Sequence, residues 1–452
     1  MKALPIVVVL LATALVPSWA ADASQTAAAA AAAAKERVRQ ALLYGIDSQV
    51  LDAIQAIKGS KDTSFTPELT QVLSAQRSTA LQAAVMDLFK DQKLRDGEER
   101  AKAILSAWQD TKDTLLIPAI QYLAAIGSPG IAPVLQPIVE SDNNPVAVAA
   151  IQALGTTGDK SAAAFLVGKL KSPDFADAAK NEVVLALGAL KDPVAEEVLL
   201  SIAGNTDEEK VRRMYAADAL GKIHDPRALP VLRTMFAEND ALIRLYAASA
   251  LSQFGLDEVF PSLLQGLRDE NPKVRQQSAK ALARPLGSSQ ADAATPILAY
   301  KAEYDPEAIV RSAAIEALGA IGGDGAMKTL LKIYSEASHP VDSREAALGI
   351  LSSKWLSGSL DAIRAVISAE WTSFDPRTLQ STAKVLSAVR SADLKDIYVR
   401  FLDSRDAIVR SYGVRGIGTN GFSDLKDRVK KMSEQDPNPG TRHEATLALE
   451  KL

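Results

Sequence analysis

This 452-residue sequence contains very few of the side chains that build reactive centres. It has no cysteine and 3 histidines, which excludes disulfide bonds, thiolate metal sites and a cysteine nucleophile, and leaves little for a histidine-built metal centre. Aromatic residues make up 5%, and the formal net charge is −4, so the chain lacks the overall basic field on which nucleic-acid binding relies. We therefore expect no catalytic centre, no cofactor, no metal and no nucleic-acid partner.

The first 20 residues have the features of a secretory signal peptide. A lysine stands second, an apolar stretch follows, and small residues occur at Ser18 and Ala20. The apolar stretch of roughly 14 residues is shorter than the ~20 needed to cross a bilayer, so we expect cleavage and no membrane span in the mature chain. Because cysteine and Asn-x-Ser/Thr sequons are both absent, we expect a secreted protein of the bacterial periplasm rather than of a eukaryotic secretory route.

A repeat runs through most of the sequence. Eight units begin with a basic residue and end seven positions later with a large aliphatic one, and their starts lie 31 to 36 residues apart except for one double step. Leu116, Ala147 and Leu379 occupy the same frame without the charge, which makes eleven units. A fixed period of this length predicts a solenoid of stacked supersecondary units. The basic starts are Lys180, Arg213, Arg244, Arg275, Arg311, Arg344, Arg410 and Arg442.

Within a unit, the pattern predicts two packed helices. Small residues usually stand three and six positions after the basic residue, which allows neighbouring helices to approach closely. A second apolar stripe with helical spacing follows. Glycines such as Gly155 and Gly221 are expected to end the first helix as C-terminal caps, and Asp192 with Pro193 to close the turn. The expected fold class is therefore all-α.

Two segments carry a specific resemblance. VRRMYAADALGKIHDPRALPVLRTMF (residues 211–236) and IVRSAAIEALGAIGGDGAMKTLLKI (residues 309–333) resemble HEAT repeats, especially the short bacterial variety related to phycobilisome-lyase repeats. The resemblance implies an α-solenoid of about eleven HEAT-like helix pairs over residues 116–452. We interpret residues 36–115 as divergent helical capping repeats, and residues 21–35 as an alanine-rich linker or frayed helix.

An acid usually stands six positions before the basic residue, and we call this paired pattern the ladder. The acid can cap a helix start, and the basic side chain can bond that carboxylate or the one in the next repeat. We favour this structural interpretation over a row of ligand-binding arginines, and in HEAT proteins such positions are similarly structural. The ladder comprises Asp174, Lys180, Asp207, Arg213, Glu238, Arg244, Asp269, Arg275, Asp305, Arg311, Arg344, Arg410, Asp436 and Arg442.

Positions one, two and five after the basic residue are expected to face away from the core. Tyr215 and Tyr246 occupy equivalent positions in adjacent units, so their rings should stack side by side. Aromatic and methionine side chains are favoured at binding hot spots, although packing between repeats is an alternative that the sequence leaves open. The candidate partner-binding face is Met214, Tyr215, Leu245, Tyr246, Gln277, Lys280 and Tyr412.

These features together predict a non-catalytic scaffold or adaptor for another protein of the cell envelope. Two alternatives stay open: a glycan- or peptidoglycan-binding protein, for which Trp108, Trp355 and Trp371 are widely scattered, and an unrecognised enzyme on a HEAT scaffold. The single His443-Glu444 pair cannot build the di-iron site of the HEAT-like deoxyhypusine hydroxylases. The last residues, LALEKL, end inside a repeat helix, so we expect its apolar edge to be covered by a partner or, through self-association of the C-terminal repeat, by a second copy.

Overall fold

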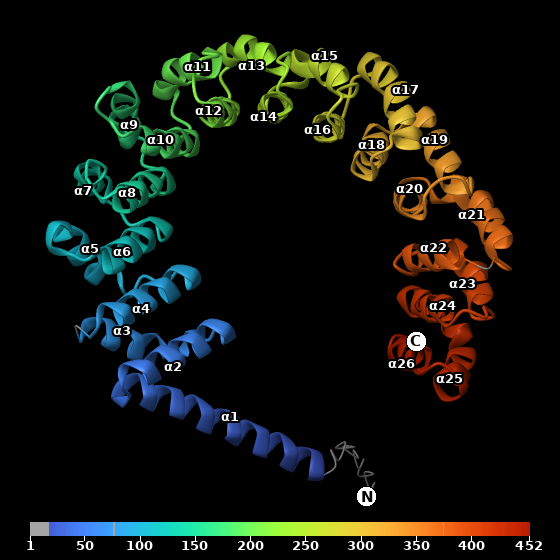
Figure 1. Ribbon diagram of the computed structural model, residues 1–452. Helices are drawn as coiled ribbons and strands as arrows, with labels where there is room; N and C mark the ends of the chain where they lie inside the picture. Colours follow the sequence, from blue (N-terminus) through green and yellow to red (C-terminus); the bar gives the residue numbers. More distant parts are fainter. Residues whose placement is uncertain (1–17, 76, 374) are drawn as a thin grey trace, which may run out of the picture. The chain divides into compact units, whose positions relative to one another are not determined.

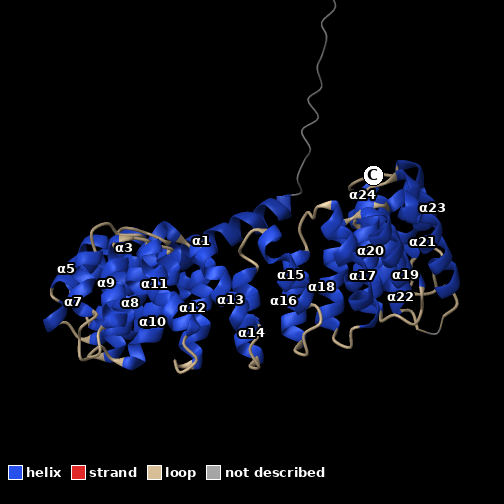
Figure 2. Cartoon of the chain, turned by 90° about the horizontal axis from the view of Figure 1, so that it is seen from above, coloured by secondary structure: helices blue, strands red, loops and turns tan. Residues whose placement is uncertain are grey.

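The computed structural model describes residues 18–75, 77–373 and 375–452. Within these residues the chain forms α-helices, short 3-10 turns and loops, and no strand (Figure 2). The all-α prediction is confirmed. Most of the predicted signal peptide, residues 1–17, lies outside the described residues. Among the helices that are described, none is both long and apolar enough to cross a membrane.

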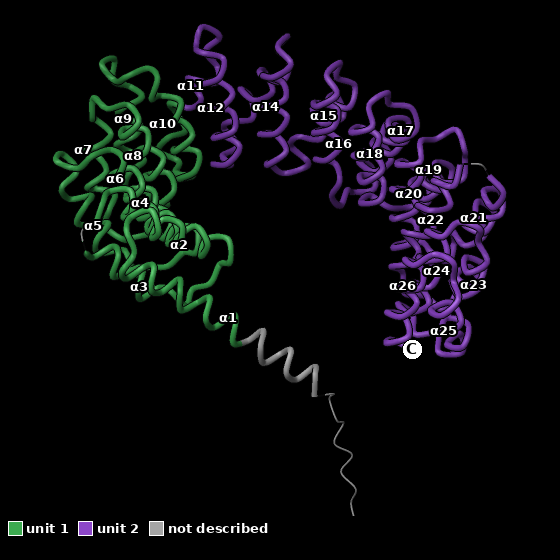
Figure 3. The backbone as a smooth tube through the Cα atoms, turned by 60° about the horizontal axis from the view of Figure 1, so that its bottom comes forward, with its two compact units in different colours: residues 1–198 green, residues 199–452 purple. Residues whose placement is uncertain are grey.

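Contacts divide the chain into two compact units, Met1–Val198 and Leu199–Leu452 (Figure 3). The helices of unit 1 are α1 (Ser18–Tyr44), α2 (Asp47–Ser60), α3 (Thr66–Ser74), α4 (Thr79–Gln92), α5 (Glu98–Ser106), α6 (Asp113–Ala125), α7 (Ala132–Ile138), α8 (Asn144–Thr157), α9 (Ser161–Lys171) and α10 (Asp177–Leu190). The chain passes from one unit to the other within α11 (Glu196–Gly204).

Unit 2 continues the same alternation of helices. They are α12 (Lys210–Ile223), α13 (Leu229–Phe236), α14 (Ala241–Leu251), α15 (Leu256–Gly266), α16 (Pro272–Leu282), α17 (Ser288–Tyr304), α18 (Ala308–Ile321), α19 (Gly323–Ser335), α20 (Val341–Lys354), α21 (Leu356–Glu370), α22 (Arg377–Ser387), α23 (Lys395–Phe401), α24 (Ala407–Asn420), α25 (Lys426–Gln435) and α26 (Pro439–Leu449).

Inside each unit the helices form two rows. Even-numbered helices pack against one another, as α6 does on α8 and α12 on α14. Each odd-numbered helix other than α11 packs on the even-numbered helix that follows it. Figure 1 shows that, within each unit, the even-numbered row lies on the inner side of the curve and the odd-numbered row on the outer side. We call these the inner and outer rows. This arrangement is the predicted α-solenoid.

The eleven sequence frames each lie in one inner-row helix, from α6 to α26. The row also continues upstream into α4 and α2, so the boundary expected between residues 115 and 116 falls inside α6. The alanine run at residues 27–34 belongs to the continuous helix α1, so the structure has a helix where a linker was one of the two expectations.

Small and aliphatic residues of the inner row form the core. In α12, Ala216, Ala219 and Leu220 are at most 1% exposed, and these are the positions where the repeat frame has its small and aliphatic residues. Burial of one such leucine stabilises the fold by about 2 kcal/mol. The core is therefore repeated once per helix pair.

The role expected for the frame glycines is wrong. Gly155 and Gly221 lie inside α8 and α12, which end two residues later, and Gly158 and His224 with positive φ values of 68° and 66° form the caps. A Cβ added at Gly155 would lie 2.8 Å from Ala186 Cα, and one added at Gly221 would lie 2.9 Å from the Cα of the equivalent alanine in α14. These glycines permit close helix contact rather than chain reversal.

Candidate functional site

The best-formed contact of the ladder joins α16 to the loop before α18. Arg275 Nε and Nη2 each donate to one carboxylate oxygen of Asp305 at 2.8 Å. Its Nη1 donates to the main-chain oxygens of Asp269 and Glu270, both at 2.9 Å. Arg275 is 7% exposed and Asp305 2%. One guanidinium thus fastens its own loop and the loop of the next helix pair.

Three further arginines of unit 2 make the same bidentate contact with the acid of the next repeat, 25 or 26 residues on. We call each such arginine–carboxylate pair a rung. The pairs are Arg213 with Glu238 at 2.5 and 3.1 Å, Arg244 with Asp269 at 2.7 and 2.8 Å, and Arg410 with Asp436 at 2.8 Å twice. Of the two partners that the sequence allowed, the structure uses the carboxylate of the next repeat.

The ladder acids do not cap the helices directly. Asp269, Asp305 and Asp436 each accept the amide of the residue two positions later, at 2.8, 3.2 and 2.9 Å. In α16 and α26 that residue is Asn271 or Asn438, whose side chain then accepts amides of the first helical turn. The expectation of an acid at the cap position is corrected: the acid shapes the loop, and the residue two positions later is the cap.

The rung carboxylates of Asp305 and Asp436 are held in their ionised form. The hydrogen bond from Arg410 is the largest influence on Asp436 and lowers its carboxyl pKa below the ordinary value. Burial by itself raises the pKa of Asp305, but hydrogen bonds from Arg275 and others outweigh it, so the net pKa is also lowered. A carboxyl held in this way is an ion-pair partner rather than a proton donor.

Three other predicted arginines find different partners. Arg344 donates to Glu370 Oε1 at 3.0 Å and Thr378 Oγ1 at 3.1 Å, neither of which belongs to the predicted ladder. Arg311 donates to Ser343 Oγ at 3.3 Å and to main-chain oxygens of its own loop. Arg442, in the last helix, donates to main-chain oxygens alone among its described partners.

Three predicted ladder members stand outside the rungs. Lys180 pairs with Asp177 one turn earlier, at 3.5 Å. The amide of Asp207 donates to Asn205 Oδ1. Asp174 is exposed and lines a cavity. The lysine and the two acids therefore carry the ladder pattern in sequence without forming a bidentate rung in the described part of the chain.

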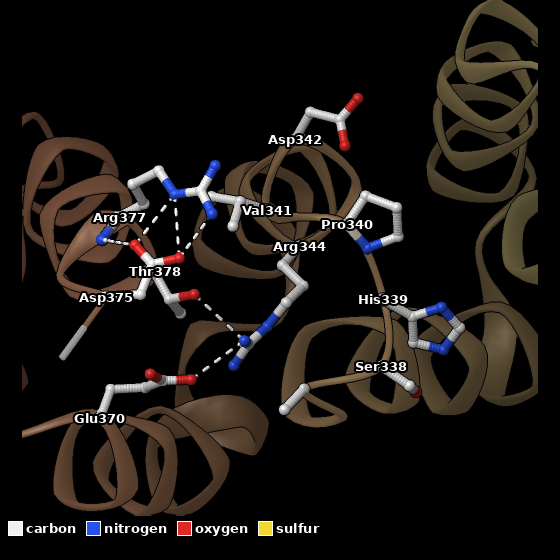
Figure 4. Close-up of a pocket in the computed structure, with 11 residues that line it drawn as sticks. Ser338, His339, Pro340, Val341, Asp342, Arg344, Glu370, Asp375, Arg377 and Thr378 are labelled. Atoms are coloured by element: carbon white, nitrogen blue, oxygen red, sulfur yellow. Dashed lines mark hydrogen bonds and ion pairs between the residues drawn. The ribbon is translucent and has the colours of Figure 1, made fainter. Parts of the chain in front are cut away.

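A cavity of about 700 Å³ lies where the ladder deviates in unit 2. In Figure 4, Arg344 points toward Glu370 and Thr378, Arg377 faces Asp375, and the ring of His339 points away from Arg344. Hydrogen bonds from Arg377 lower the pKa of the Asp375 carboxyl to about 2. Both guanidinium groups are already matched by carboxylates, so the cavity has no unpaired arginine to hold an anion.

The predicted partner-binding face is only partly exposed. The Tyr215 and Tyr246 rings are neighbours, with centroids 6.5 Å apart, but they are tilted by 54° rather than stacked. Met214 is 8% exposed and belongs to the core, against expectation. The other members of the face are partly exposed, namely Leu245, Gln277 and Tyr412, or exposed, namely Lys280. Tyr412 also lies under the guanidinium of Arg415 at 5.2 Å.

Three exposed aliphatic residues extend this face and were missed by sequence reasoning. Leu242, Ile309 and Ile408 are 46%, 41% and 49% exposed, each in the first turn of an inner-row helix. The available signal was their common place two positions before a ladder arginine, outside the apolar stripe of the helix. A separate exposed leucine, Leu447, is 39% exposed on α26, and self-association there stays a prediction.

Solved structures with the same fold include karyopherins and importin beta. Kap95p, whose binding induces the switch loops of RanGDP to adopt the GTP-bound conformation, aligns with a TM-score of 0.54 and 12% identity over 92% of this chain and 60% of its own. Importin beta aligns with a TM-score of 0.52 and 13% identity over 92% of this chain and 66% of its own. Kap121p bound to the extreme C-terminus of the protein phosphatase Cdc14p aligns with a TM-score of 0.50 and 12% identity over 92% of this chain and 53% of its own. The chain spans half to two thirds of their length, and the likeness shows the fold.

No curated protein matches the chain significantly. A family model described as spirochaete HEAT repeat protein matches residues 42–447. The match extends through the rungs, the inner-row face and the helices upstream of α6, including most of the segment expected to be divergent. The protein therefore belongs to the spirochaete HEAT repeat protein family.

Proposed function

We propose that the protein is a non-catalytic scaffold or adaptor that holds another protein of the cell envelope on the inner row of unit 2. The observation that carries this proposal is the recurrence of apolar side chains that reach the surface at equivalent inner-row positions. Tyr215 and Tyr246 form one pair, which is partly exposed, and Leu242, Ile309 and Ile408 form a second set, which is exposed. Repeated aromatic and aliphatic groups at the surface of a solenoid are suited to an extended protein partner.

The similar folds support a protein ligand. Kap95p and Kap121p are HEAT-type solenoids whose solved complexes contain protein partners, RanGDP and a phosphatase C-terminus respectively. A glycan face would instead need clustered exposed aromatics. Trp108 lies in the 3-10 turn after α5, in unit 1, whereas Trp355 and Trp371 flank α21 in unit 2. The predicted export signal at residues 1–20 supports a partner in the periplasm or envelope.

The proposal is tested by affinity co-purification of the tagged full chain from envelope extracts of its native cells. The variant Tyr215→Ala, Tyr246→Ala removes the paired rings. A matched control is Tyr300→Ala, Tyr304→Ala on α17 of the outer row, because these rings are also neighbours, 5.4 Å apart, and more exposed at 61% and 56%.

We expect a stoichiometric protein partner that is lost in the first variant and retained in the control. Loss in the control alone would assign binding to the outer row and contradict the proposed face. Absence of any protein partner, in extracts where the tagged chain is folded and abundant, would contradict the scaffold function itself.

A further inference from the structure

One position of the ladder has kept its acid and lost its base. In the rungs of unit 2, arginine and acid occur together. Where the base is replaced by Leu116 or Leu379, the acid position of the next repeat holds Ser141 or Ser404 instead. Ala147 departs from this rule, because the corresponding position of the next repeat is Asp174. Unit 1 thus contains a half-rung: an acid whose cationic partner is missing.

A cavity of about 360 Å³ lies at this half-rung. Ala147 and Asp174 both line it, on the two sides that a rung arginine would join. Asp174 has no side-chain hydrogen bond or ion pair among the described residues, whereas the nearby Lys169 is paired with Glu140. The basic residue of the lining, Lys169, is therefore already neutralised, and the carboxylate of Asp174 is available.

Two loop residues of the cavity stand at the positions whose main-chain oxygens hold a guanidinium elsewhere in the chain. Three of the four rung arginines, Arg244, Arg275 and Arg410, donate to the main-chain oxygens six and five positions earlier. The equivalents for Ala147 are Ser141 and Asp142, and both line the cavity. An alanine side chain ends at Cβ, so the volume that a rung arginine fills is open here.

We propose that this cavity binds the arginine side chain of a protein partner, which completes the half-rung from outside the chain. The inference rests on the proposed scaffold function and adds a second, chemically defined contact in unit 1. A planar guanidinium can meet Asp174 with two parallel bonds and still donate to the loop oxygens, whereas a lysine ammonium is a point charge without that geometry. Because Asp174 is exposed, the contact contributes partner selection and register more than affinity.

The direct test uses saturation-transfer NMR, which detects weak binding to the full-length protein. The probe is the peptide acetyl-Gly-Arg-Gly-amide, and its matched control contains citrulline, which has the same shape without the charge. Two variants address the site separately: Ala147→Arg fills the cavity with the chain's own guanidinium, and Asp174→Asn removes the acid. Asp110→Asn, on an exposed turn of the same unit, makes the same charge change elsewhere.

We expect the arginine peptide to bind the wild type and Asp110→Asn, and to lose about tenfold in affinity in both site variants, as removal of one charge-assisted pair gives. The citrulline peptide should bind the wild type no more tightly than the arginine peptide binds the two site variants. Equal binding of the arginine peptide to the wild type and Asp174→Asn would overturn the proposal, and this arm does not depend on how well Ala147→Arg folds.

The two proposals can fail separately. Peptide binding that depends on Asp174, without any captured protein in the co-purification, would keep the site and remove the scaffold function. Capture of a partner that is retained by Asp174→Asn, together with no peptide binding, would keep the scaffold and remove the site.

Discussion

The two units share their helix packing but differ in how consecutive repeats are fastened. In both units, an inner-row glycine lets the backbone of the next inner helix pack closely against it. The pairs are Gly155 with Ala186 in unit 1 and Gly221 with Ala250 in unit 2. Unit 2 adds arginine–carboxylate rungs, one of them buried and three partly exposed, which the described part of unit 1 does not contain. Close packing therefore defines the solenoid, and the rungs are an additional fastening.

Unit 1 fastens its repeats with arginines at other positions. Arg77 donates to the main-chain oxygen of Gly45 and to Asp47, both at 2.9 Å. Arg95 donates to the main-chain oxygen of Ile126 at 2.8 Å. These arginines stand in loops rather than in the inner helices, so they fall outside the repeat frame. The same chemistry serves both units, but only unit 2 places it periodically.

The largest effect is expected from removing a buried rung. Arg275→Ala removes the bidentate partner of the buried Asp305, which keeps Lys301 at 3.3 Å, and frees two main-chain oxygens, so we expect a loss of about 3 kcal/mol in the free energy of unfolding, at the low end for a broken buried pair. Urea unfolding measures this loss, and hydrogen exchange should show that it is concentrated around α16 and α18. Partner binding should be unchanged at temperatures where the variant is folded.

The control is Arg442→Ala, because that arginine makes main-chain contacts without a rung carboxylate in the described structure. We expect its cost to be no more than about 1.5 kcal/mol. Equal losses of unfolding free energy in the two variants would mean that the buried ion pair does not stabilise unit 2 beyond the main-chain hydrogen bonds of its arginine.

The second effect tests what the units have in common. Gly221→Ala and Gly155→Ala each place a Cβ against the backbone of the next helix, so each should cost about 1–3 kcal/mol through overpacking. The controls are Gly349→Ala in α20 and Gly168→Ala in α9, where an added Cβ meets nothing within 4 Å.

At those two control positions alanine should instead stabilise the helix by up to about 1 kcal/mol. Urea midpoints of the four variants provide the comparison. If Gly221→Ala were tolerated as well as Gly349→Ala, close contact between inner helices would not define the packing of unit 2.

The third and smallest effect is the pH dependence of a rung. The hydrogen bond from Arg410 lowers the pKa of Asp436 in the folded protein, so below the ordinary value of about 4 the unfolded chain binds more protons. The stability that this pair contributes is fully present above about pH 4 and is lost as the pH falls toward the folded pKa.

Arg410→Gln should therefore reduce the difference in unfolding free energy between pH 7 and pH 3. Arg442→Gln should change that difference much less, because Arg442 is the smallest of the influences that lower the pKa of Asp436, whereas the hydrogen bond from Arg410 is the largest. A wild-type pH dependence in Arg410→Gln would show that Asp436 is not stabilised as an anion by this arginine.

The sequence predicted the positions of the inner helices because the frame of basic, small and aliphatic residues is local and repeats with each helix pair. It left open which carboxylate each arginine meets, since partners 25 to 30 residues apart depend on how the repeats stack. Glu370 could not be identified as the partner of Arg344 because it stands outside the frame. The function of Gly221 was misassigned because a cap and a close helix contact both favour glycine.

The half-rung shows a different limit. The loss of the base at Ala147 and the retention of Asp174 are both visible in the sequence. Their significance required the structure, because only the rungs of unit 2 show that each arginine reaches forward to the next repeat. With that direction known, the cavity identifies the unmatched acid.

The central claim is that the rungs stabilise the protein whereas the inner-row tyrosines bind its partner. The most direct test is quantitative co-purification of the partner with the wild type, Tyr215→Ala, Tyr246→Ala and Arg275→Ala, below the lowered unfolding temperature of the arginine variant. We predict that the tyrosine variant loses the partner while its unfolding is little changed, and that the arginine variant keeps the partner despite its lower stability. Loss of the partner in folded Arg275→Ala, with retention in the tyrosine variant, would contradict the account.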